Sequence, residues 1–346
     1  MNTYRAGIDI GSTTVKLVVL DEQDYMLYGD YRRHHAHTQQ TLADLLREAR
    51  AALGECALRC AITGSGSINL GRALDIPFVQ EVVAVATALE KRYPQTDVAI
   101  ELGGEDAKII FFDRATGGMD ERMNGSCAGG TGAFIDQMAT LLDVDVAELD
   151  RLSQQSTRIY PIASRCGVFA KTDVVPLLNE GAAREDLAAS IFQAVVEQTI
   201  GGLASGDSIW GNVAFLGGPL HFLSALRERF IETLQLKPDE VMDVPDAQFI
   251  VARGTALSLM ALPGQPRPVH AEALTVEELA ERARTRELDG ERTATLEPLF
   301  ADEAEYEAFR QRHAVGAVAR RPLEDARGPL YLGVDLGSTT VKAVLT

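Results

Sequence analysis

Short apolar runs that end near glycine alternate along the chain with segments whose apolar residues recur every three or four positions. The first pattern predicts strands and the second predicts amphipathic helices. Strands are expected at 7–20 and 98–113, each as two strands around a glycine turn, and at 25–33, 58–63, 212–220 and 248–252. Helices are expected at 41–53, 82–89, 129–142, 182–203, 221–236, 254–262, 275–286 and 302–313, and from Cys166 towards 178. Interleaved in this way, the elements are those of an α/β protein.

The length and composition predict a globular protein. The chain has 346 residues, of which 46% are hydrophobic, enough for two lobes with separate cores or for one bilobed domain and a tail. It has no run of about 18 uncharged apolar residues and no signal-peptide layout at its start, so we expect a cytoplasmic protein without membrane contact. The net charge of −17 opposes nonspecific binding to nucleic acid.

The first strand–turn–strand segment, GIDIGSTTVKLVVL at 7–20, has the residues of a phosphate-binding hairpin. Asp9 ends the first strand, where it can reach a metal ion, and Lys16 adds a positive charge. Gly11 lets the backbone approach a phosphate closely, and hydroxyl donors come from Ser12, Thr13 and Thr14. An ordinary β-hairpin with a polar turn explains a single motif of this kind equally well.

The same motif recurs at 333–346 as GVDLGSTTVKAVLT. This recurrence favours the phosphate-binding interpretation of both copies. The repeated polar and glycine positions are Asp335, Gly337, Ser338, Thr339, Thr340 and Lys342. Two strands alone cannot bury a core, so we expect 330–346 to be the start of a second, truncated ATPase repeat in a longer chain.

A second glycine-turn hairpin, VAIELGGEDAKIIFFD at 98–113, repeats the layout of the first. Gly103 and Gly104 allow the backbone to approach phosphate from the opposite side. Three carboxylates are candidates for holding Mg²⁺ through water or for orienting an attacking water: Glu101, Glu105 and Asp106. Farther along, Gly217 and Gly218 follow a buried strand, at the strand end where open α/β sheets bind ligands, and are expected beside the adenosine.

Two of the four cysteines stand at the start of predicted helices. Cys127 lies in NGSCAGGTGAF at 124–134, and Cys166 lies in ASRCGVFAKTDVV. A helix start favours the thiolate, the form that binds metal. The alternative is that both are simply buried, as small hydrophobic residues. Cys56 and Cys60, on or beside an apolar strand, are predicted to be structural.

The composition changes after 262, where prolines introduce a charged stretch. A helix over 275–286 is expected to be capped by Thr275 with Glu278. We interpret 263–329 as a charged connector whose helices have solvated faces, with partner binding as the alternative. The expected division is a first lobe at 1–95, a second lobe with the cysteines at 96–262, this connector, and the truncated repeat.

The two hairpins, followed by a strand that ends in two glycines, resemble in order and content the actin, hexokinase and heat-shock chaperone ATPase superfamily. Within it, NGSCAGGTGAF, RCGVFAKTDV and the DIGSTT opening resemble the activator components of 2-hydroxyacyl-CoA dehydratases and the ATPase subunits of benzoyl-CoA reductases. The resemblance covers residues 1 to about 260. It implies an actin-like (ribonuclease H-like) fold with two lobes around a nucleotide cleft.

The resemblance also implies a function. ATP with Mg²⁺ would bind in the cleft, and its hydrolysis would drive low-potential electron transfer through a 4Fe–4S cluster. Two cysteines from each of two chains, Cys127 and Cys166, would hold the cluster in a homodimer, or in a pseudo-dimer of tandem repeats. The implied electron donor is reduced ferredoxin or flavodoxin. The implied partner is an iron–sulfur protein similar to 2-hydroxyacyl-CoA dehydratase or benzoyl-CoA reductase.

One departure keeps two other functions open. Members of the family commonly have aspartate and glutamine where this chain has Glu101 and Glu105. A small-molecule kinase of the sugar or polyol type would explain the phosphate hairpins but not the cysteines. A nucleotide-binding scaffold without turnover would explain the altered carboxylates.

Overall fold

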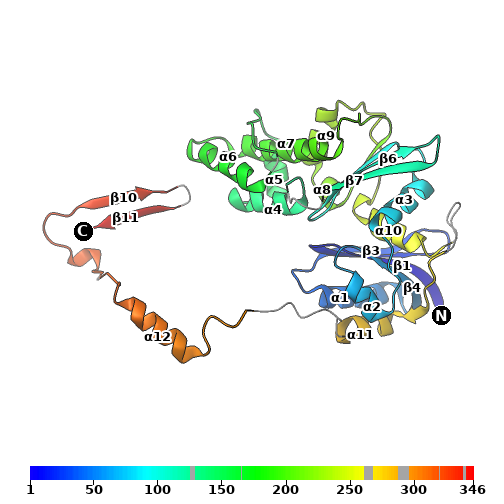
Figure 1. Cartoon of the computed structure of the whole chain (residues 1–346), viewed down its shortest axis with the longest axis horizontal. Coiled ribbons are helices and arrows are strands. Elements are labelled where there is room, and N and C mark those ends of the chain that lie inside the picture. Colours follow the sequence, from blue (N-terminus) through cyan, green and yellow to red (C-terminus); the bar gives the residue numbers. More distant parts are fainter. Residues whose placement is uncertain (125–128, 165, 261–267, 287–295, 319, 338–339) are drawn as a thin grey trace. The chain divides into compact units, whose positions relative to one another are not determined.

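A computed structural model of the chain describes residues 1–124, 129–164, 166–260, 268–286, 296–318, 320–337 and 340–346. They form two units, Met1–Asp289 and Gly290–Thr346. The first unit contains two sheets with their helices (Figure 1). Among the described residues, no helix has both the length and the apolar character needed to cross a membrane.

The first sheet has the strand order β3-β2-β1-β4-β9. Its strands are β1 (Asn2–Ile10), β2 (Thr14–Leu20), β3 (Met26–Arg33), β4 (Cys56–Thr63) and β9 (Ala273–Thr275). Only β1 and β4 pair in parallel, and the other neighbours are antiparallel. The apolar faces of α1 (Thr38–Leu53), α2 (Ile68–Leu74) and α11 (Val276–Thr285) pack together with this sheet in one core. The predicted hairpin at 7–20 and the strand at 25–33 are confirmed.

The second sheet has the order β7-β6-β5-β8. It consists of β5 (Val98–Leu102), β6 (Ala107–Asp113), β7 (Gly118–Asn124) and β8 (Val213–Leu216). A second core joins it to α4 (Gly132–Leu141), α5 (Val146–Ser153), α6 (Gly167–Asn179), α7 (Arg184–Leu203) and α9 (Ser224–Leu234). The sequence did not predict β7, an edge strand with little apolar patterning whose residues are exposed or half-buried.

Two helices, α3 (Glu81–Arg92) and α10 (Ile250–Leu257), pack in a third core with strands from both sheets (Figure 1). Their backbones lie very close to their neighbours. A Cβ on Gly7 would come 1.8 Å from the carbonyl oxygen of Ala252, and a Cβ on Gly254 would come 1.7 Å from that of Ala84. The contact between α10 and both β1 and α3 therefore requires glycine at these two positions.

The strand predicted at 248–252 is wrong. These residues form the end of a 3-10 turn, Ala247–Phe249, and the start of α10. Every residue of α10 is buried. A helix that is buried on all sides need not alternate apolar and polar faces, so a short apolar stretch of it cannot be distinguished from a buried strand by pattern.

Two other predicted helices differ in their bounds. The helix expected at 129–142 begins only at Gly132. The helix expected at 221–236 is divided into α8 (Gly218–Phe222) and α9, because Leu223 is extended between them.

Part of the predicted connector, 263–329, belongs to the first sheet instead. β9 pairs with β4, and α11 buries Val276, Leu279, Ala280 and Ala283 in the core shared with α1. The predicted capping box of Thr275 and Glu278 is present. The many charged residues of α11 led to its assignment as a solvated connector helix, but they cover only one face, and the apolar stripe on the other face is buried.

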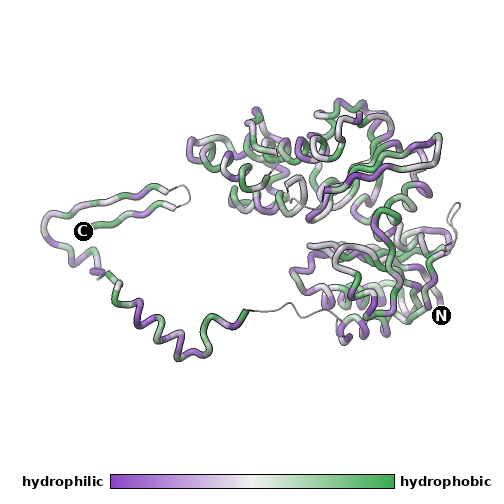
Figure 2. The backbone as a smooth tube through the Cα atoms, in the orientation of Figure 1, coloured by the Kyte–Doolittle hydropathy of each residue, from purple (hydrophilic) through white to green (hydrophobic). Residues whose placement is uncertain are grey.

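The second unit consists of the exposed helix α12 (Glu303–Ala314), a 3-10 turn (Leu323–Asp325) and the antiparallel pair β10 (Leu332–Leu336) and β11 (Val341–Leu345). In Figure 2, α12 is mostly hydrophilic, whereas the strands of the two sheets in the first unit have long hydrophobic stretches. Asp335 pairs with Lys342 in the register in which Asp9 pairs with Lys16. The strands on either side of the turn therefore pair in the same way in both copies of the motif.

Candidate functional site

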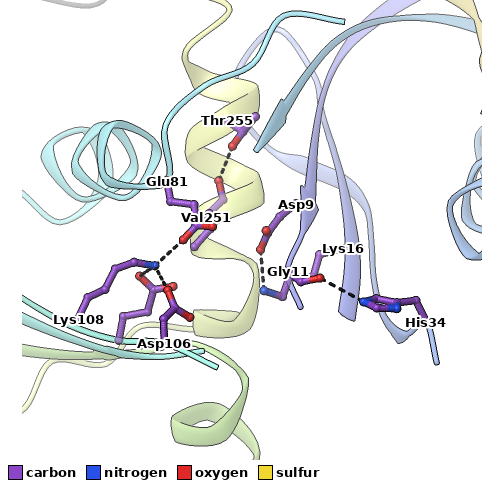
Figure 3. Close-up of polar contacts among 10 residues, drawn as sticks. Asp9, Gly11, Lys16, His34, Glu81, Asp106, Lys108, Val251 and Thr255 are labelled. Carbon is purple, nitrogen blue, oxygen red and sulfur yellow. Dashed lines mark hydrogen bonds and ion pairs between the residues drawn. The ribbon is translucent and has the colours of Figure 1, made fainter. Parts of the chain in front are cut away.

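The two predicted phosphate hairpins face each other in the first unit. One pocket is lined by residues of both: Asp9, Gly11, Ser12, Thr13, Thr14 and Lys16 from the first hairpin, and Glu101, Gly103, Gly104 and Asp106 from the second. The turns touch, since a Cβ on Gly104 would lie 2.5 Å from Thr13 Oγ1 and 2.9 Å from Ser12 Oγ. Figure 3 shows Lys16 with Asp9 on one side, Lys108 with Glu81 and Asp106 on the other, and the start of α10 at Val251 between them.

In the first hairpin, Lys16 lies opposite Asp9, with its Nζ 2.6 Å from Asp9 Oδ2. Both side chains are nearly buried. Burial would lower the pKa of Lys16, but the Asp9 carboxylate, with Tyr31 and Glu101, raises it above the usual range. The ammonium ion is therefore retained at the base of the pocket.

Sequence reasoning missed two residues that support this hairpin. The Nε2 of His34 lies 3.1 Å from the carbonyl oxygen of Gly11, and its backbone N–H donates to Thr13. The ring of Tyr31 packs 5.5 Å from Lys16 Nζ and edge-on against Phe222. Both follow from the pairing of β3 with β2, which a local pattern does not specify.

In the second hairpin, Lys108 lies opposite Glu101 on the neighbouring strand. Its Nζ is 2.5 Å from Glu81 Oε2, 2.7 Å from Asp106 Oδ2 and 3.7 Å from Glu101 Oε2. Burial would lower the pKa of Lys108, but these three carboxylates raise it well above its usual value. Glu101 and Lys108 have the same spacing as Asp9 and Lys16, a signal in the sequence that could have revealed Lys108.

The three carboxylates predicted in this hairpin do not share one environment. Burial raises the pKa of Glu101 to about 7. In the described part of the chain, Glu101 Oε2 has no hydrogen-bond partner. Asp106 lies over Gly103, where a Cβ would come 2.0 Å from its Oδ1. Glu105 is exposed and lines an outer groove together with Phe78 and Met123.

The glycine pair lies beside the second hairpin, because β8 runs parallel to β5. Gly217 has a positive φ of 88°, and a Cβ there would come 2.1 Å from the carbonyl oxygen of Leu102. A Cβ on Gly218 would come 2.4 Å from the Tyr31 hydroxyl. Neither glycine lines the phosphate pocket itself.

These residues fit a magnesium-bound triphosphate. Three side-chain hydroxyls and Lys16 face the pocket as donors, and the glycine turns leave room for the backbone to approach phosphate. Carboxylate oxygens, the ligands that Mg²⁺ prefers, line the pocket at Asp9, Glu101 and Asp106. Among the described residues these three do not form a metal site by themselves, so phosphate oxygens and water would complete the coordination of Mg²⁺.

Helix α4, which follows the Cys127 segment, is bonded directly to the second phosphate turn. The backbone N–H of Gly132 donates to the carbonyl of Gly103 at 3.0 Å, and that of Ala133 donates to Gly104 at 2.8 Å. These N–H groups belong to the first turn of α4, where a helix has no internal acceptors for them. Two backbone hydrogen bonds therefore hold the turn and the start of α4 together.

Of the two cysteines predicted to bind a cluster, Cys127 lies outside the described residues. Cys166 is half-buried and is the N-cap of α6. The next residue, Gly167, lies against α4, since a Cβ there would come 3.3 Å from the ring of Phe134. The starts of α4 and α6 are thus neighbours. In the described part of the chain, no group of three or more His, Cys, Asp or Glu residues is arranged to hold a metal ion.

The prediction that Cys56 and Cys60 are structural agrees with their positions. Both are buried in the core of the first sheet. Burial raises the pKa of Cys60 to about 12, so its thiol stays protonated at neutral pH.

Known proteins are similar to this chain in sequence. Residues 6–258 match the BadF/BadG/BcrA/BcrD ATPase family. The (R)-2-hydroxyglutaryl-CoA dehydratase activating ATPase of Acidaminococcus fermentans is 31% identical over 260 residues, covering 74% of this chain and 97% of that protein. The 2-hydroxyisocaproyl-CoA dehydratase activator of Clostridioides difficile is 30% identical over 240 residues, covering 68% and 89%.

A solved structure extends the likeness to the fold. The activator of the 2-hydroxyisocaproyl-CoA dehydratase from Clostridium difficile, with bound ADPNP, superposes with a TM-score of 0.64 at 27% identity. The match covers 73% of this chain and 93% of that one. The fold is therefore the actin-like fold of these activators. The chain belongs to the BadF/BadG/BcrA/BcrD ATPase family.

Proposed function

We propose that this protein is an ATP-dependent activator that couples ATP hydrolysis to low-potential electron transfer. Its partner would be an iron–sulfur protein similar to 2-hydroxyacyl-CoA dehydratase or benzoyl-CoA reductase. The observation that carries the proposal is the pair of hydrogen bonds from the start of α4 to Gly103 and Gly104. They connect the phosphate turn to the helix that follows Cys127. The relatives of this chain are named as dehydratase activators, which supports a dehydratase-like partner.

In this proposal the nucleotide lies between the two hairpins. Backbone and hydroxyl groups of the turn at Ser12 and Thr13, with Lys16, bind phosphate oxygens. Asp9, Glu101 and Asp106 hold Mg²⁺ directly or through water. Glu105, in the outer groove that Ser12 and Asp106 also line, would orient an attacking water, and Gly217 with Gly218 would lie beside the adenosine.

Nucleotide binding can move α4 only if the nucleotide has unequal affinity for two arrangements of the lobes. The pocket would meet this condition because the residues that line it come from two hairpins on different sheets. Triphosphate between the turns bonds to both, whereas diphosphate leaves one turn without its partner. The hydrogen bonds of Gly132 and Ala133 make α4 follow the second turn.

Cys127 and Cys166 would hold one side of a 4Fe–4S cluster, and a second copy of the chain or a tandem repeat would hold the other. Such a cluster supplies a one-electron carrier of low potential when bound. Reduced ferredoxin or flavodoxin is the proposed donor. Cys166 suits the role because it is partly accessible at a helix start, next to α4.

Anaerobic iron and sulfide analysis with electron paramagnetic resonance, with and without MgATP, tests the proposal. We expect about four irons per dimer and a signal that changes with MgATP. Cys166→Ser should remove the iron while leaving MgATP affinity unchanged. Cys56→Ser is the matched control, and this variant should retain the iron. Colourless protein that phosphorylates a polyol would contradict the proposal and support a kinase.

A further inference from the structure

The side chains of Arg33 and Asp136 connect the two lobes beside the phosphate pocket, where the first lobe is the first sheet with its core and the second lobe is the second sheet with its core. Arg33 is the last residue of β3 in the first sheet, and Asp136 lies in α4 of the second lobe. The guanidinium donates from Nη1 to Oδ2 at 2.8 Å and from Nη2 to Oδ1 at 3.0 Å. Two parallel hydrogen bonds of this kind fix the orientation of the partners as well as their distance.

The backbone at Arg33 is held close to the first phosphate turn. Arg33 pairs in register with Thr14 of β2, and the N–H of the next residue, His34, donates to the carbonyl of Thr13 at 3.1 Å. A shift of the first turn relative to the second lobe must therefore displace Arg33 as well.

Helix α4 consequently has two attachments to the pocket. Through the N–H groups of Gly132 and Ala133 it is bonded to the second turn, which belongs to its own lobe. Through Asp136 it is bonded to the strand beside the first turn, in the other lobe. If the lobes separate as rigid bodies, the first attachment survives and the second breaks.

We propose that Arg33 and Asp136 form a latch that couples closure of the nucleotide cleft to the position of α4, and thereby to the Cys127 segment that precedes it. The proposal rests on the proposed binding of nucleotide between the lobes. By linkage, if the latch favours the closed arrangement, MgATP and the latch stabilise each other by the same factor.

The strand offers a matched control one residue away. Arg32 donates to Glu48 of α1 through two hydrogen bonds of 3.0 and 2.8 Å, the same forked geometry, but both partners lie in the first lobe. Arg33→Gln and Arg32→Gln each remove one forked ion pair, and Arg32→Gln also removes the contact of Arg32 with Asp30 inside the first lobe. Only Arg33→Gln removes a contact between lobes.

Hydrogen exchange of peptides from α4, measured by mass spectrometry with and without MgATP, tests the latch. In Arg33→Gln we expect α4 to exchange up to about fivefold faster and MgATP affinity to fall by a similar factor. This factor corresponds to the free energy that a partly exposed ion pair usually contributes. In Arg32→Gln both should match the wild type. The charge-reversed variant Arg33→Asp/Asp136→Arg should restore both, which a merely structural role for Arg33 would not allow.

Equal α4 exchange in Arg33→Gln and Arg32→Gln, or failure of the reversed pair to restore it, would overturn the latch. Calorimetric titration of the wild type with MgATP distinguishes failure of the latch from failure of the proposed function. Absence of binding there would refute the proposed function, and the exchange rates without nucleotide would still decide whether the latch holds α4.

Discussion

The ammonium nitrogen of Lys108 lies 2.5 Å from a carboxylate oxygen of Glu81, and this contact joins the second hairpin to the first turn of α3. Lys108 is only 2% exposed and also contacts Asp106 and Glu101. One buried cation thus compensates carboxylates from three places in the sequence. The nucleotide pocket depends on it, because Glu101 and Asp106 line that pocket.

Lys108→Met should lower the free energy of unfolding by about 3 kcal/mol, because it leaves the buried Glu101 and the partly buried Glu81 and Asp106 without their counter-charge. Urea unfolding monitored by circular dichroism measures the change. Lys237→Met is the control, since Lys237 is 75% exposed and 3.9 Å from Glu240. Equal stability of the two variants would show that the cluster is not compensated by Lys108.

Glu101 predicts a dependence of stability on pH. Burial raises its pKa from the usual 4.5 to about 7, so the folded chain binds the proton more tightly than the unfolded chain. The stabilisation is fully present below about pH 4.5 and is lost as the pH rises to about 7, at up to about 1.4 kcal/mol per unit.

Glu101→Gln should remove this slope, because the amide does not titrate. Urea unfolding of nucleotide-free protein in chelator, at several pH values between about 5 and 7, provides the comparison. A slope that is unchanged in the variant would assign the pH dependence to another group.

Gly104→Ala should weaken MgATP binding about tenfold, since a contact under 3.0 Å displaces the hydroxyl groups of the first turn. The added Cβ would lie 2.5 Å from Thr13 Oγ1. Gly201→Ala is the control, because a Cβ on this α7 glycine meets nothing within 4 Å. Isothermal titration with MgATP measures both. Wild-type affinity in Gly104→Ala would mean that the turns do not approach each other when nucleotide binds.

Tyr31→Leu should lower the free energy of unfolding by about 1–2 kcal/mol, through loss of the contacts of its ring with Lys16 and Phe222. Tyr31→Phe should retain most of that stability, because the ring remains. Tyr25→Leu, at a tyrosine that is 68% exposed, should have little effect. Thermal unfolding followed by calorimetry distinguishes the three variants.

Much of the site could be predicted from sequence because it consists of hairpins. In an antiparallel hairpin the turn sets the register, so the residues that face each other are determined locally. Asp9 and Lys16 face each other for this reason, and so do Glu101 and Lys108. The capping box at Thr275 is equally local and was predicted correctly.

The errors concern segments whose surroundings are not local. The residues at 248–252 were predicted as a strand because α10 is buried on every side. The stretch at 273–285 was assigned to a connector because its charges are visible in the sequence, whereas its place beside β4 and α1 is not. In both cases the deciding partner lies far away along the chain.

The sequence alone therefore determined the two glycine-turn hairpins, with their glycines, hydroxyls and carboxylates, and the family resemblance that these motifs carry. Only the tertiary structure decided which hairpin residues meet residues of other elements. The contacts of Lys108 with Glu81, of Arg33 with Asp136, and of Gly103 with Gly132 join residues from different elements. The physical reason is that local patterns fix hydrogen bonds within a hairpin or helix, whereas contacts between elements depend on how the completed sheets and helices pack.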